Sequence, residues 1–116
     1  MTRRTSYRLR DIIDAVDQID SLLGDKTFDD LVRDRFLKAA FERFVEILSE
    51  ASRHIPQEMQ NAAGDVEWTK VAAIGNHLRH AYHRVDDEVI WNIYATGELA
   101  ILRQAVSRML EGLAET

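Results

Sequence analysis

The sequence contains no cysteine and only one proline and five glycines in 116 residues. Without cysteine there is no disulfide, no thiolate metal ligand and no cysteine nucleophile, which fits a reducing compartment. Since proline and glycine are the residues that most often interrupt helices, their scarcity predicts long helices. There is no run of 18 uncharged apolar residues and no signal peptide pattern, so we expect a cytoplasmic protein without a membrane span.

Hydrophobic residues make up 46% of the chain and charged residues 30%, which is typical of a folded globular protein. The length predicts one domain covering residues 1–116. The formal net charge of -5 disfavours nucleic-acid binding by the whole surface, so RNA or DNA would need a local basic patch. Two such patches are Arg3, Arg4, Arg8 and Arg10, and His77, Arg79, His83 and Arg84. For the first patch, a solvated start of a helix is the alternative interpretation.

Apolar residues recur with helical spacing along most of the chain, and no stretch alternates like a strand. We therefore predict an all-α protein, an antiparallel helical bundle of four to five helices that dimerises. The expected helices run from Thr5 or Ser6 to Gly24, from a capping box at Thr27 and Asp30 to just before Pro56 with a break near Asp34, from Pro56 to Ala63, from Glu67 to about His83, and from a cap at Asp86 to about Leu113.

The apolar faces of two helices are wider than one core needs. Phe36, Phe41 and Phe44 occupy different angular positions, and Trp91 lies about 100° from Ile90. Such a broad apolar surface on a small helical protein indicates a homodimer interface. The alternative is a fully covered core with Trp91 half exposed.

The stretch from residue 74 to residue 91 concentrates groups that move protons and bind anions. Asn76 and His80 are four residues apart and would share one face of a helix. An imidazole such as His80 titrates near neutral pH, Tyr82 brings a hydroxyl close to it, and Arg79 and Arg84 are cations suited to a phosphate. These are the groups that metal-free RNA cleavage requires, in which a 2'-hydroxyl attacks the adjacent phosphorus.

Two other interpretations of this stretch remain. Arg79 and Arg84 would be exposed residues at a helix end, paired with the acidic residues that follow. His77, His80 and His83 would form a metal site, but the first and last differ by about 120° around one helix and cannot readily bind one ion together. We therefore expect no metal and no other cofactor.

The chain resembles the HepT-like ribonucleases, minimal members of the HEPN superfamily. The resemblance is carried by the segments Arg10–Val16 and Ala40–Ala51, by Trp68, by Asn76–Tyr82, and by Val85, Asp86 and Trp91. It implies an all-helical bundle that dimerises, so that two motif helices form one cleft for an RNA substrate. It also implies a toxin of a toxin-antitoxin pair, with an MNT-type nucleotidyltransferase as the antitoxin.

The family motif is an arginine, four to six residues, a histidine, one residue and a tyrosine. By this resemblance His80 is the catalytic histidine, Asn76 the polar residue after the arginine, and Tyr82 a target of nucleotide transfer. The chain departs from the pattern at Gly75, where the arginine would fall, and at Ser49, which replaces the usual glycine. Losing that cation would cost about 3 kcal/mol, roughly a hundredfold in rate.

The missing arginine leaves the function open among three classes of protein. Either Arg79 or Arg84 supplies the cation and the protein cleaves RNA, with His77 and His83 as further phosphate-binding groups. Or the chain is a catalytically inactive subunit that docks to a nucleotidyltransferase. A helical carrier of a metal or another ligand is a third class.

Overall fold

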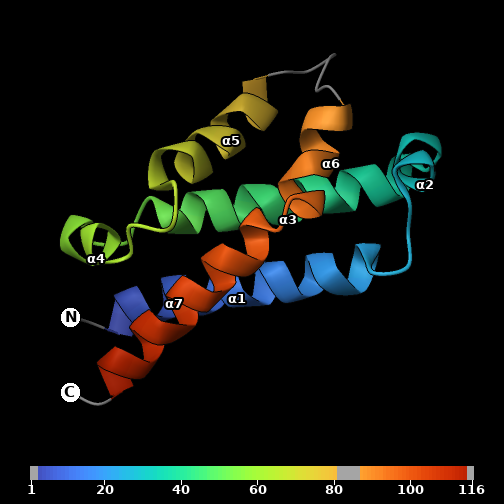
Figure 1. The fold of residues 1–116 in the computed structure, drawn as a ribbon. Helices are drawn as coiled ribbons and strands as arrows, with labels where there is room; N and C mark the ends of the chain where they lie inside the picture. Colours follow the sequence, from blue (N-terminus) through green and yellow to red (C-terminus); the bar gives the residue numbers. More distant parts are fainter. Residues whose placement is uncertain (1–2, 81–86, 115–116) are drawn as a thin grey trace.

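The structure is a computed structural model that describes residues 3–80 and 87–114, and all regular structure in these two ranges is helical. The helices are α1 (Arg3–Leu23), α2 (Phe28–Arg33), α3 (Arg35–Ser52), α4 (Gln57–Ala62), α5 (Trp68–His80), α6 (Asp87–Ala95) and α7 (Glu98–Ala114) (Figure 1). The predicted all-α fold is confirmed. None of the helices in the described ranges is long and apolar enough to cross a bilayer.

The core lies along α1 and α3, which run antiparallel and side by side; α7 packs on α1, and α5 packs on α3 (Figure 1). Fully buried apolar side chains recur at helical spacing on the facing surfaces of these helices. They include Leu9, Ile12, Val16, Ile19 and Leu23 of α1, Phe41, Val45 and Leu48 of α3, and Leu102 and Val106 of α7. Burying an aliphatic side chain of this size contributes about 1.5–3 kcal/mol, so α1 and α3 form a firm base for α5.

The start of α1 differs from the prediction, whereas its end agrees with it. The helix includes Arg3, so Thr5 and Ser6 are not its caps; Thr5 is buried inside it, and Ser6 Oγ donates to Arg3 O at 3.2 Å. Arginine favours helix nearly as much as alanine does, so the helix extends beyond the serine that could have capped it. It ends at Leu23, before Gly24, as predicted.

The capping box and the break near Asp34 are confirmed. Thr27 N donates to Asp30 Oδ2 at 2.8 Å, and Asp30 N donates to Thr27 Oγ1 at 3.2 Å. The Asp34 carboxylate accepts hydrogen bonds from the backbone of Phe36 and Leu37 at 3.0 and 3.1 Å, so Asp34 ends α2 and caps α3. The short helix α4 is also present, with Pro56 as its N-cap residue rather than in its first turn.

The single long helix predicted from residue 87 to residue 113 is wrong. α6 ends at Ala95, and α7 begins at Glu98. Between them Gly97 has φ of +82°, a left-handed conformation that glycine adopts without strain and that ends a helix. This second break explains why seven helices, rather than four or five, occur within the described ranges. The predicted cap at Asp86 lies outside them.

The aromatic residues behind the predicted dimer surface separate into two groups. Phe41 is fully buried, and Trp91 is half-buried against the rings of Phe28 and Tyr94, with centroid distances of 6.2 and 5.6 Å. Phe36 instead leaves 82% of its surface exposed at the start of α3. The wide apolar face of α3 is therefore not covered by the chain itself at Phe36.

Candidate active site

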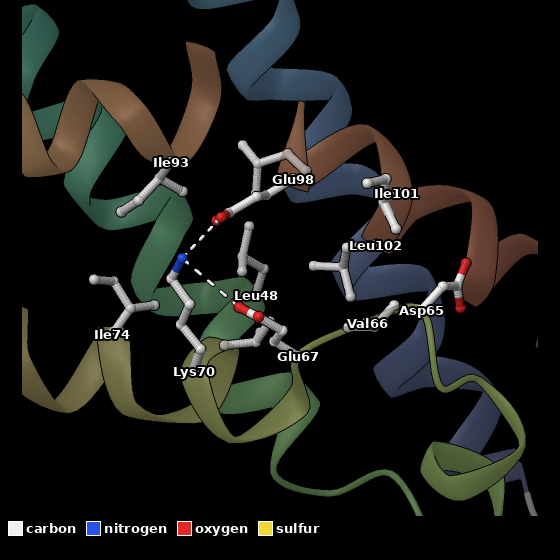
Figure 2. A pocket seen from close by; sticks show the side chains of 12 residues that line it. Leu48, Asp65, Val66, Glu67, Lys70, Ile74, Ile93, Glu98, Ile101 and Leu102 are labelled. Atoms are coloured by element: carbon white, nitrogen blue, oxygen red, sulfur yellow. Dashed lines mark hydrogen bonds and ion pairs between the residues drawn. The ribbon is translucent and has the colours of Figure 1, made fainter. Parts of the chain in front are cut away.

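The first turn of α5 is held by neighbours on two sides. Trp68 is buried, and its Nε1 donates to Ala63 O at 3.1 Å. Lys70 Nζ lies 2.7 Å from Glu98 Oε1 and 3.8 Å from Glu67 Oε2, so it lies between the two carboxylates (Figure 2). The hydrogen bond with Glu98, and then its charge, raise the pKa of Lys70. These exposed pairs guide the start of α5 but add little stability.

The middle of α5 approaches α3 unusually closely at Gly75. Ser49 Oγ lies 2.7 Å from Val71 O and 3.0 Å from Ala72 O, and Gly75 N donates to the same oxygen at 3.0 Å. A Cβ added at position 75 would lie 2.5 Å from Ser49 Oγ and 2.7 Å from Ser49 Cβ. Carbon atoms normally stay about 3.5–4.0 Å apart, so an arginine at position 75 would force neighbouring atoms to move.

The opposite face of α5 carries the polar residues of the motif. Ala73, Asn76 and His77 are exposed, whereas Gly75 and Leu78 are buried. Because successive residues are about 100° apart, position 80 falls within about 40° of position 76 around the helix axis. Asn76 and position 80 therefore lie on the same face of α5, as expected from their spacing.

Several predicted site residues lie beyond what the structure describes. The backbone of Arg79 and His80 belongs to α5, but their side chains are outside the described part. Tyr82, His83 and Arg84 lie outside the described residues altogether. The predicted contacts among these side chains therefore stay predictions.

The start of α6 is attached to α3 by an ion pair. Lys38 Nζ lies 2.5 Å from Asp87 Oδ1, and both side chains are half-buried. One turn further along α3, burial raises the pKa of the Glu42 carboxyl; the charge of Lys38 opposes this shift, and the charges of Glu46 and Asp87 add to it. The two helices on either side of residues 81–86 thus both contact α3.

A pocket of about 270 Å³ lies on the other side of α5, between α3, α5 and the start of α7 (Figure 2). Its walls are mainly aliphatic, and Lys70, Glu67 and Glu98 lie at its rim. The aliphatic lining includes Leu48, Val71, Ile74, Ile93, Leu99 and Leu102. Neither Asn76 nor His77 lines this pocket, so it is separate from the polar face of α5.

The first predicted basic patch lies on α1. Arg3, Arg4 and Arg10 are exposed at the start of α1, with Arg8 half-buried. The start of α1 and the end of α5 lie at different ends of the bundle (Figure 1). Within the described part of the chain, no group of three or more histidine or acidic residues is arranged to hold a metal ion.

Comparison with known proteins decides the family. The HepT-like ribonuclease model matches residues 12–109, which include α3, α5 and most of α7. The chain belongs to the HepT-like ribonuclease family. It is 32% identical over 91 residues to a protein of Thermococcus cleftensis named "Probable ribonuclease HepT", covering 78% of this chain and 83% of that protein.

Two further relatives agree with this assignment. A candidate RNase of Methanocaldococcus jannaschii is 31% identical over 85 residues, covering 73% of this chain and 70% of the relative. A candidate RNase of Caldanaerobacter subterraneus is 32% identical over 85 residues, covering 73% and 75% respectively. No solved structure matches the HepT-like chain.

The structure gives Ser49 a larger role than the sequence alone indicates. In the sequence it is one of two departures from the family pattern, whereas in the fold its hydroxyl contacts three backbone atoms of α5. The signal in the sequence was that the two departures, Ser49 and Gly75, occur together. Their contact shows that both belong to one helix crossing.

Proposed function

We propose that this HepT-like protein is the toxin subunit of a toxin-antitoxin pair and cleaves RNA in the cytoplasm without a metal ion. The observation that carries the proposal is the division of α5 into two faces: Gly75 and Leu78 are buried against the bundle, and Asn76 and His77 are exposed. A polar face at the end of a buttressed helix is accessible to a nucleic-acid strand. Membership of a ribonuclease family supports the same substrate.

In the proposed reaction His80 removes the proton from a ribose 2'-hydroxyl, and the 2'-oxygen attacks the adjacent phosphorus. The bond from phosphorus to the 5'-oxygen breaks, and that oxygen takes the proton back from the protonated His80, leaving a 2',3'-cyclic phosphate and a 5'-hydroxyl. Asn76 orients the reacting groups. The negative charge that develops on the phosphorane is balanced by cationic side chains of the motif. These are Arg79, Arg84, His77 and His83.

The proposed enzyme is a homodimer in which the motif helices of two copies line one cleft. The exposed ring of Phe36, 82% of whose surface is accessible, supports an apolar contact surface on α3. Val32 is also exposed, and Phe28 is partly so. Covering such residues on association stabilises a dimer through the hydrophobic effect.

Expression in growing cells tests the catalytic proposal. The wild-type chain expressed without its antitoxin should arrest growth, and His80→Ala should relieve the arrest. His54→Ala is the matched control, because His54 is an exposed imidazole at the end of α3 that pairs with Glu50 at 3.2 Å. Arrest by His80→Ala equal to that of the wild type would contradict the catalytic role.

The proposed antitoxin is an MNT-type nucleotidyltransferase that modifies Tyr82. A nucleotide on this tyrosine would bring bulk and negative charge beside the motif and repel the RNA backbone. Intact-mass and peptide mass spectrometry after co-expression should locate the adduct on Tyr82. Tyr7, whose side chain is exposed on α1, should remain unmodified. Co-expressed protein that never carries the adduct would count against this mode of control.

A second candidate function is a catalytically inactive subunit that docks to a nucleotidyltransferase. The observation that favours it is Gly75, which stands where the motif arginine is expected and is buried against Ser49. An inactive subunit would bind the nucleotidyltransferase but would not arrest growth in any expression test.

A further inference from the structure

We propose that Ser49 is a positioning residue for the motif helix, acting through the space that Gly75 leaves open. Its hydroxyl fixes the rotation of α5 and its position along the helix axis on α3, and therefore where Asn76 and residue 80 stand. The inference rests on the proposed function for its catalytic consequence, although its structural part can be tested without RNA.

One buried side-chain atom of Ser49 makes several contacts with α5. Ser49 is 1% exposed, and its Oγ accepts from Gly75 N while facing the carbonyl oxygens of Val71 and Ala72 at 2.7 and 3.0 Å. A serine hydroxyl has one hydrogen, so the two carbonyls share it, and its lone pairs face the amide. One side chain thus contacts backbone atoms from three positions on the next helix.

These contacts restrict both the rotation of α5 about its axis and its translation along that axis. Apolar packing alone permits helices to rotate or slide by small amounts, because dispersion contacts are not directional. Hydrogen bonds weaken steeply when distance or angle changes. Since Ser49 Oγ meets two acceptors, at Val71 and Ala72, and one donor, at Gly75, a rotation or slide of α5 would break at least one of these contacts.

The fit at Gly75 depends on the Ser49 hydroxyl. Any side chain there would place a Cβ 2.5 Å from Ser49 Oγ, so the hydroxyl occupies the space that a Cβ would need. Glycine in a helix interior is unfavourable relative to alanine, and the close contact gives a reason for it at this place. The polar residue of the motif, Asn76, follows directly and faces outwards.

The experiment compares Ser49→Ala with Ser52→Ala. Ser52 is a matched control, because it is a buried serine on the same helix whose Oγ donates only to Ser49 O at 2.6 Å and does not reach α5. Both variants lose one buried hydroxyl, so we expect both to lower Tm by about 4–8 °C. The readouts are the NMR resonances of the His77 and His80 imidazoles, and kcat and KM for an RNA oligonucleotide.

Ser49→Ala should shift the resonances of both imidazoles and lower kcat by about tenfold or more, with KM changed less than about twofold, because a misplaced catalytic group weakens chemistry more than binding. Ser52→Ala should leave both readouts close to the wild type. If Ser49→Ala shifts the imidazole resonances no more than Ser52→Ala does, the positioning role is refuted.

Two further arms keep the test decisive. Gly75→Ala disturbs the same contact from the other helix, so it should move the same imidazole resonances if Ser49→Ala does not fold. If the wild-type protein does not cleave RNA, the proposed function fails, and the resonance shifts still decide the positioning role. Unchanged resonances in Gly75→Ala would overturn that role as well.

Discussion

Restoring the family arginine by Gly75→Arg should damage the protein rather than improve it. The new Cβ would lie 2.5 Å from Ser49 Oγ and 2.7 Å from Ser49 Cβ, distances at which neighbouring atoms must move. Overpacking of this kind costs about 1–3 kcal/mol, whereas replacing glycine in a helix returns up to about 1 kcal/mol. With the full return the net loss is up to about 2 kcal/mol, which lowers Tm by up to about 10 °C in a domain of this size.

The matched control is Gly112→Arg on α7. Gly112 is also helical but exposed, and a Cβ there would meet nothing within 4 Å. This variant should be neutral or raise Tm by a few degrees, since only the helix propensity changes. The difference between the two arginine variants therefore measures the close contact alone.

A double-mutant cycle isolates the contact further. Ser49→Gly removes both atoms that a new Cβ at position 75 would strike, so Gly75→Arg should be less destabilising in that background by about 1–3 kcal/mol. Urea denaturation of the wild type, the two single variants and the double variant gives this coupling free energy. Additive effects in the double variant, or equal Tm changes in Gly75→Arg and Gly112→Arg, would refute the reasoning.

The remaining predictions concern the charged groups. The hydrogen bond from Arg103 lowers the pKa of Asp17, so Asp17 stabilises the fold above its unfolded pKa of about 3.9, and this contribution is lost as pH falls through the lower folded value. Because the pair is half-exposed, Asp17→Asn should lower Tm by only about 2 °C at neutral pH, and by less in thermal melts at pH values below about 3.9. Burial raises the pKa of the Glu42 carboxyl, so the fold loses stability as pH rises from the pKa of the unfolded chain through that of the folded protein. Glu42→Gln should therefore raise Tm at neutral pH. In melts below about pH 4 this gain should vanish. In an RNA cleavage assay, at least one of Arg79→Ala and Arg84→Ala should lower the cleavage rate about tenfold or more, because one of these arginines supplies the missing cation. Unchanged cleavage in both variants would eliminate that role.

Most of the fold could be predicted from local patterns. The capping box at Thr27, the break at Asp34 and the end of α1 before Gly24 each follow from the chemistry of one or two residues. The break at Gly97 was missed as a helix boundary, because an isolated glycine in an apolar periodic stretch is compatible with a weakened helix. Its left-handed backbone depends on how α6 and α7 pack, which periodicity does not contain.

The candidate site was predictable only in part for a similar reason. Spacing indicated that Asn76 lies on the polar face of a helix, and the structure places it there. The role of Gly75 could not be predicted, since it depends on a residue 26 positions earlier in the chain, Ser49. A missing arginine looks like a simple loss in the sequence, whereas in the fold it belongs to a paired contact between two helices.

The most direct test of the central claim is cleavage of an RNA oligonucleotide by the purified protein in EDTA, with one linkage carrying a 2'-deoxyribose. We predict products with a 2',3'-cyclic phosphate and a 5'-hydroxyl, no cleavage at the deoxyribose, and activity that is lost in His80→Ala but kept in His54→Ala. Cleavage at the deoxyribose linkage, or cleavage by His80→Ala at the wild-type rate, would contradict the account.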